Sequence, residues 1–168
     1  AIPGKRAISQ ESAFIISHIL LDNFARSQAF GTNSQLVVKD RTVSVKTGTT
    51  DDKKDNWTIG FTPNFLSVVW VGNNDNTPMN QALTSGVTGA APIWNRIMTH
   101  VLEPQPDLKP RKPASVVGTQ VCWGTGAMAS GSSCQSRFEY IIKGTEKLVN
   151  RGVTSKREQV WVTRDSDK

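Results

Sequence analysis

Three strand-like runs follow one another with very little chain between them, and this feature constrains the fold most. They span residues 42–49, 57–61 and 65–72, and each is rich in Val, Ile, Trp, Phe and Thr. The link 50–56 is polar, and residues 62–64 form a Thr-Pro-Asn turn. Because such short links join antiparallel neighbours, we predict an antiparallel meander.

Helical patterns lie on both sides of these runs. Ser9 is the predicted N-cap of a helix that runs to about Arg26 and carries a wide apolar face. Residues 88–102 place apolar side chains at helical spacing. We therefore predict an α+β fold, an antiparallel sheet flanked by helices. The large aromatic side chains are expected in its core: Trp57, Phe61, Trp70 and Trp94.

Proline marks a domain boundary. Residues 105–115 are predicted to be an extended linker that does not pack, between one domain (1–104) and a small β-rich tail module (116–168) with β-prone runs at 140–142 and 160–163. The cysteines, Cys122 and Cys134, favour a disulfide in an oxidising compartment, with two free buried thiols as the alternative.

The charge and the polar residues exclude several functions. The net charge of +6 divides into +1 for residues 1–104 and +5 for residues 105–168, so the tail is either a solvated surface or a contact for an acidic partner. No motif that reads nucleic acid accompanies the charge, so no nucleic-acid partner is predicted. Two cysteines without nearby histidines cannot form a four-ligand zinc site, and nothing in the chain implies a metal or an organic cofactor.

The motif that carries chemistry is Lys46-Thr47-Gly48-Thr49-Thr50 at the end of the first predicted strand. Alternation along a strand puts Thr47 and Thr49 on one face and Lys46 and Gly48 on the other. Hydroxyls, backbone N–H groups and an ammonium suit an anionic peptide terminus, and glycine allows close approach. An ordinary turn is the alternative, whereas a phosphate-binding loop needs a different residue order.

The surrounding motifs resemble one family. Four segments occur in the order found in class A (bifunctional) penicillin-binding proteins: 43–50, 55–63, 69–75 and 88–94. The resemblance is clear from Ser9 to Leu102 and looser over the tail. It implies the C-terminal part of a transpeptidase domain, in which a serine of a Ser-x-x-Lys motif attacks the D-alanyl-D-alanine end of a peptidoglycan stem peptide or a β-lactam.

The resemblance also implies roles for the motif residues. Lys46 would assist proton transfer and hold the substrate carboxylate, and the N–H of Thr49 would form half of the oxyanion hole. Thr47 and Thr49 would hydrogen-bond the carboxylate, with Gly48 and Thr50 completing the substrate-binding strand.

The nucleophile is missing from this sequence. No serine is followed by Lys three residues later or by Asn two residues later. No apolar run reaches the ~18 residues of a membrane span. We therefore expect an upstream part of the same protein to supply the serine and a membrane anchor, an extracytoplasmic location in the cell envelope, and no activity of this segment alone. The alternatives are a serine β-lactamase relative and a non-catalytic module that binds the cell wall through its tail.

Overall fold

The computed structural model describes residues 4–80, 87–129 and 134–146. The chain forms two units, Ala1–Pro113 and Ala114–Lys168, and the division falls inside the predicted linker 105–115. None of the helices within the described residues is both long and apolar enough to cross a bilayer.

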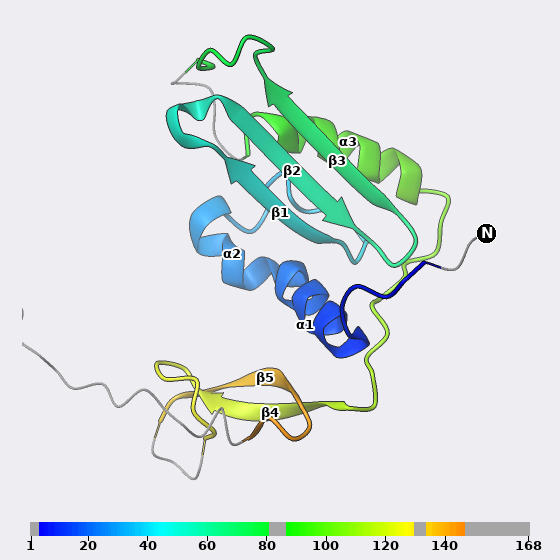
Figure 1. The fold of residues 1–168 in the computed structure, drawn as a ribbon, viewed down its shortest axis with the longest axis vertical. Coiled ribbons are helices and arrows are strands. Elements are labelled where there is room, and N and C mark those ends of the chain that lie inside the picture. The colour runs from blue at the N-terminus through cyan, green and yellow to red at the C-terminus, as the bar shows by residue number, and fades with distance from the viewer. Residues whose placement is uncertain (1–3, 81–86, 130–133, 147–168) are drawn as a thin grey trace, which may run out of the picture. The chain divides into compact units, whose positions relative to one another are not determined.

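The first unit contains the predicted meander. Strands β1 (Ser44–Thr49), β2 (Asp55–Phe61) and β3 (Leu66–Gly72) pair antiparallel in the order β1-β2-β3 (Figure 1). In the register, Thr49 lies opposite Asn56 and Trp57 lies opposite Trp70. The α+β prediction and the antiparallel sheet are confirmed.

The predicted first helix is two helices. Helix α1 (Gln10–Leu21) begins after the predicted cap Ser9, whose Oγ accepts a hydrogen bond from the Ser12 N–H at 3.1 Å. Helix α2 (Asn23–Phe30) follows, because Asp22 adopts an extended conformation and accepts from the Ala25 N–H at 2.9 Å. Aspartate favours such capping positions over a helix interior, which explains the break.

Helix α3 (Ala90–Leu102) covers one face of the sheet (Figure 1). Trp94 is fully buried in the core of this unit and lies against Gly60 of β2. The core also contains aliphatic side chains from β1, β3, α3 and the segment before β1: Leu36, Val38, Val43, Val45, Val69, Met98 and Leu102.

The opposite face of the sheet is largely open. Trp57 is 39% exposed and Trp70 is 40% exposed, so the prediction that these two side chains belong to the core was wrong. Alternation along β2 and β3 puts Ile59, Leu66 and Val68 on the same face, and these are also exposed. We define these five residues as the open apolar face.

The stretch after α3 is attached to the sheet rather than extended into solvent. The Asp107 carboxylate accepts hydrogen bonds from the Thr42 N–H at 2.6 Å and from the Thr42 hydroxyl at 2.7 Å. Arg41 donates to the carbonyls of Leu102 and Glu103, both at 3.1 Å. The expectation that this stretch does not pack was wrong as far as Asp107, because specific hydrogen bonds offset its proline content.

The second unit is built on a hairpin. Strands β4 (Val116–Cys122) and β5 (Ser136–Ile142) pair antiparallel, and β5 includes the predicted run 140–142. A disulfide joins Cys122 and Cys134. The predicted run 160–163 lies outside the described residues.

Candidate functional site

The Lys-Thr-Gly-Thr strand lies at an edge of the sheet. Among the described residues, β1 pairs only with β2, and α1 lies beside its other edge (Figure 1). The Thr50 N–H donates to the Asp55 carbonyl at 3.0 Å. Because N–H groups alternate in direction along a strand, the N–H of Thr49 points away from β2, toward the free edge. An edge strand with an outward N–H is the geometry that an oxyanion donor needs.

Lys46 and Gly48 are exposed on the face opposite α3. The Lys46 ammonium donates to the carbonyl oxygen of Thr47, which lies on the free edge of the strand. A Cβ added to Gly48 would have only the Cβ of Trp57 nearby, at 3.9 Å. The strand therefore leaves space for another chain to approach its backbone here.

The hydroxyls of Thr47 and Thr49 point to the same side of the strand, but they differ in exposure. Thr47, on the face of the sheet that also carries α3, is only 9% exposed, whereas Thr49, one alternation further along the strand, is exposed. Of the two hydroxyls that the sequence indicated, Thr49 is thus the more accessible to a ligand.

The end of β1 is held by the start of β2. The Thr50 hydroxyl accepts from the Asp55 N–H at 2.8 Å and donates to the Asp55 carboxylate at 3.1 Å. The same carboxylate accepts from the indole N–H of Trp70 at 2.8 Å. These bonds close the 50–55 turn and fix the backbone that follows Thr49.

Asn56 is a site residue that the sequence did not single out. Its side chain is fully buried, its Nδ2 donates to the Thr49 hydroxyl oxygen at 2.9 Å, and its Oδ1 accepts from the Ala90 N–H at 2.7 Å. The sequence shows only that Asn56 is a polar residue in a strand whose side chains alternate between two faces. It does not show which of the two faces of that strand is buried.

A hollow lies at the free edge of β1, between this strand and the first two helices. It contains two cationic groups, Lys46 and Arg26, and the Arg26 guanidinium also donates to the Leu20 carbonyl at 2.7 Å. Burial lowers the pKa of Arg26, and the nearby Asp22 carboxylate partly opposes this effect. The hollow is lined by Ile19, Leu20, Asp22, Ala25, Arg26, Phe30, Leu36, Val45, Lys46 and Thr47.

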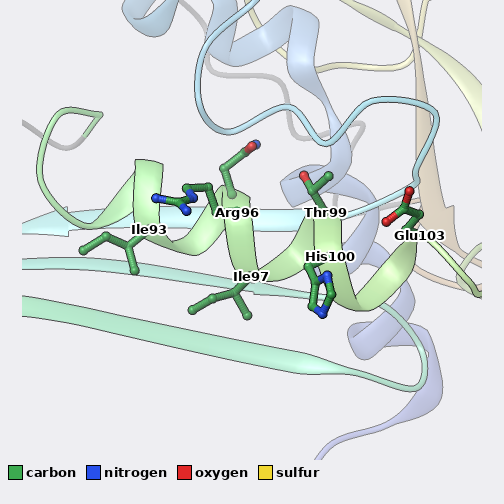
Figure 2. Close-up of a pocket in the computed structure, with 7 residues that line it drawn as sticks. Ile93, Arg96, Ile97, Thr99, His100 and Glu103 are labelled. Carbon is green, nitrogen blue, oxygen red and sulfur yellow. The ribbon is translucent and has the colours of Figure 1, made fainter.

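Another hollow follows the outer side of α3 and contains none of the motif residues. Figure 2 shows Ile93 and Ile97 along this side of the helix, with Arg96 and His100 nearby. Within residues 4–80, 87–129 and 134–146, no group of three or more His, Cys, Asp and Glu residues could hold a metal ion.

Comparisons with known proteins agree with this arrangement. No family model matches the chain. Penicillin-binding protein 1A of Escherichia coli K12 is 30% identical over 155 residues, which cover 83% of this chain and 18% of that protein. Penicillin-binding protein 1A of Clostridium botulinum (strain Langeland) is 34% identical over 149 residues, which cover 84% of this chain and 17% of that protein.

A solved structure matches as well. The crystal structure of penicillin-binding protein 1A from Haemophilus influenzae superposes with a TM-score of 0.71 and 29% identity, over 84% of this chain and 21% of that one. The chain thus spans about one fifth of the length of the relatives that it matches. It belongs to the penicillin-binding protein family and corresponds to a segment from the C-terminal part of those proteins.

Proposed function

We propose that this chain is the part of a serine D,D-transpeptidase that supplies the Lys-Thr-Gly strand for cross-linking peptidoglycan stem peptides. The observation that carries the proposal is the position of β1 at a sheet edge, with the Lys46 ammonium exposed and the Thr49 N–H directed outward. Acyl transfer requires donors fixed in advance where negative charge develops, and an edge strand provides them without reorganisation.

Each motif residue has a part in this proposal. Lys46 holds the substrate carboxylate electrostatically and assists proton transfer, and the Thr49 N–H is one of the two oxyanion donors. The hydroxyls of Thr47 and Thr49 hydrogen-bond the carboxylate, with Thr49 the more accessible. Gly48 and Thr50 allow the peptide or β-lactam to lie along the strand.

The nucleophilic serine belongs to an upstream part of the same protein, because none of the 168 residues forms a Ser-x-x-Lys motif. The open apolar face of the sheet supports this view, since five exposed large apolar side chains on one face are typical of a surface that packs against more protein. We place the whole protein outside the cytoplasmic membrane, anchored by an upstream segment. The disulfide is compatible with that oxidising location.

Fluorescent penicillin tests the proposal. The longer protein should be labelled covalently, residues 1–168 alone should not, and Lys46→Gln in the longer protein should lower the acylation rate at least 100-fold, the cost of losing one transition-state donor. Lys39→Gln is the matched control, because Lys39 is also an exposed lysine of this unit but lies outside β1. Labelling of residues 1–168 alone, or equal rates for Lys46→Gln and wild type, would contradict the proposal.

A second candidate function rests on the hairpin unit. Trp123 and Phe138 are exposed there, and the Arg137 guanidinium lies 4.9 Å from the centre of the Trp123 ring. Exposed aromatic and cationic side chains are typical of binding surfaces. If this unit binds the cell wall, deletion of residues 105–168 should abolish sedimentation with peptidoglycan, and unchanged sedimentation would exclude that role.

A further inference from the structure

The side-chain amide of Asn56 connects the end of β1 to the start of α3. Asn56 is fully buried and lies directly opposite Thr49 in the sheet. One end of the amide donates to the Thr49 hydroxyl oxygen at 2.9 Å, and the other end accepts from the Ala90 N–H at 2.7 Å. A single buried group therefore reaches both the motif strand and the N-terminus of the helix that covers the sheet.

The orientation of this amide is fixed by its partners. The Ala90 N–H can only donate, so the atom that faces it must be the amide oxygen, and the NH₂ group must then face Thr49. Gly89 leaves room for the amide, since a Cβ at that position would lie 2.5 Å from Oδ1. If the amide turned over, its NH₂ group would face the Ala90 N–H, donor against donor, so the observed orientation is the one that both partners allow.

This orientation determines what the Thr49 hydroxyl can do. A hydroxyl carries one proton and two lone pairs, and Thr49 uses one lone pair to accept from Asn56. The NH₂ group of an amide does not accept a hydrogen bond, so the Thr49 proton cannot be directed toward Asn56. It is directed away from the buried amide, and Thr49 is more exposed than Thr47, the other motif hydroxyl on this face.

We propose that Asn56 is a positioning residue for acyl transfer: it holds the Thr49 hydroxyl as a hydrogen-bond donor to the substrate carboxylate. The proposal rests on the function proposed above. The contact of Asn56 with Thr49 is separate from its contact with α3, because the NH₂ group of the amide faces Thr49 and the oxygen faces the Ala90 N–H.

Asn56→Asp separates the two roles in the longer, penicillin-reactive protein. Aspartate still accepts from the Ala90 N–H at the N-terminus of α3, which favours a negative charge, while burial of the carboxylate should lower the melting temperature. Its carboxylate cannot donate to Thr49 and instead accepts the Thr49 proton, which removes the donor from the substrate. Acylation by penicillin should slow about 10- to 100-fold, the range for a hydrogen bond to a charged group.

Two further comparisons distinguish positioning from a structural effect. Thr49→Val should slow acylation to a similar extent. In the Thr49→Val background, Asn56→Asp should then slow acylation no further, because the effects of two residues that act through one contact are not additive. With the methyl ester of the same penicillin, which lacks the carboxylate, wild type and Asn56→Asp should differ by less than threefold. Should Asn56→Asp fail to fold, Asn56→Ser, whose hydroxyl is too short to bridge both partners, replaces it in the same cycle.

Asn95→Asp is the matched control, because Asn95 donates to the carbonyls of Gln35 and Val37, neither of which belongs to β1. It should leave the acylation rate unchanged. Two results would overturn the inference about Asn56 while the proposed function stands. One is that Asn56→Asp slows acylation as much in the Thr49→Val background as in wild type. The other is that it slows acylation by the penicillin and by its methyl ester equally. If Thr49→Val acylates at the wild-type rate, the role of Thr49 in the proposed function fails, and the inference fails with it.

Discussion

Gly60→Ala should destabilise the first unit more than alanine at either of the other glycines of its sheet, Gly48 and Gly72. Gly60 lies on the buried face of β2, opposite Val45, and the fully buried indole of Trp94 occupies the space where a side chain would be. A Cβ at Gly60 would lie 2.1 Å from Cζ2, 2.7 Å from Cε2 and 2.9 Å from Nε1 of Trp94.

The size of the effect follows from these distances. Ordinary van der Waals contact begins at 3.4 Å, so the ring would have to retreat by about 1.3 Å, the difference from 2.1 Å. The ring is rigid and packed on all sides, and overpacking of this kind costs about 1–3 kcal/mol. Alanine recovers about 0.5–1 kcal/mol because glycine is the less favourable residue in a strand. Taking the upper end of the overpacking range, we expect the free energy of unfolding to fall by about 2 kcal/mol in total.

Urea unfolding of the chain, followed by far-ultraviolet circular dichroism, measures this loss. Gly48→Ala is the control, since its added Cβ would meet only Trp57 at 3.9 Å, and stability should be unchanged or slightly higher. Trp94→Phe shortens the ring, so the double variant with Gly60→Ala should lose less than the sum of the two single losses. Equal stabilities of Gly60→Ala and Gly48→Ala would refute the packing argument.

Three other perturbations have expected outcomes. Partial burial raises the pKa of Asp107, but the hydrogen bonds from Thr42 and two nearby cations together hold that pKa below its ordinary value of 3.8. Asp107→Asn should therefore lower the free energy of unfolding near pH 7, and the difference in stability between wild type and variant should vanish as acid protonates Asp107. A difference in stability that stays constant down to about pH 2 would contradict this. Cys122→Ser should destabilise the hairpin unit by about 3 kcal/mol, from a cross-link between residues 12 apart, without changing the unfolding of the first unit. The Thr58 hydroxyl is buried without a hydrogen-bond partner among the described residues, so Thr58→Val should raise stability by about 1 kcal/mol, and a loss of stability in urea would show that the hydroxyl is needed.

The sequence determined the local elements and the motif. Runs of β-branched and aromatic residues with short polar links are sufficient to predict β1, β2 and β3 as a meander, because neighbours in a chain with such links can pair in few other ways. Ser9 predicted the start of α1, since a cap is a local interaction between a side chain and the next turn. The order of four motifs predicted the family.

Only the tertiary structure decided which groups face one another. Alternation separates the two faces of a strand but does not say which one is buried, so Trp57 and Trp70 were expected in the core and lie on the open apolar face instead. The same limit concealed Asn56, whose significance comes from Ala90, 34 residues away in the chain. A contact at that separation depends on how α3 packs against the sheet, and a pattern confined to neighbouring residues carries no information about it.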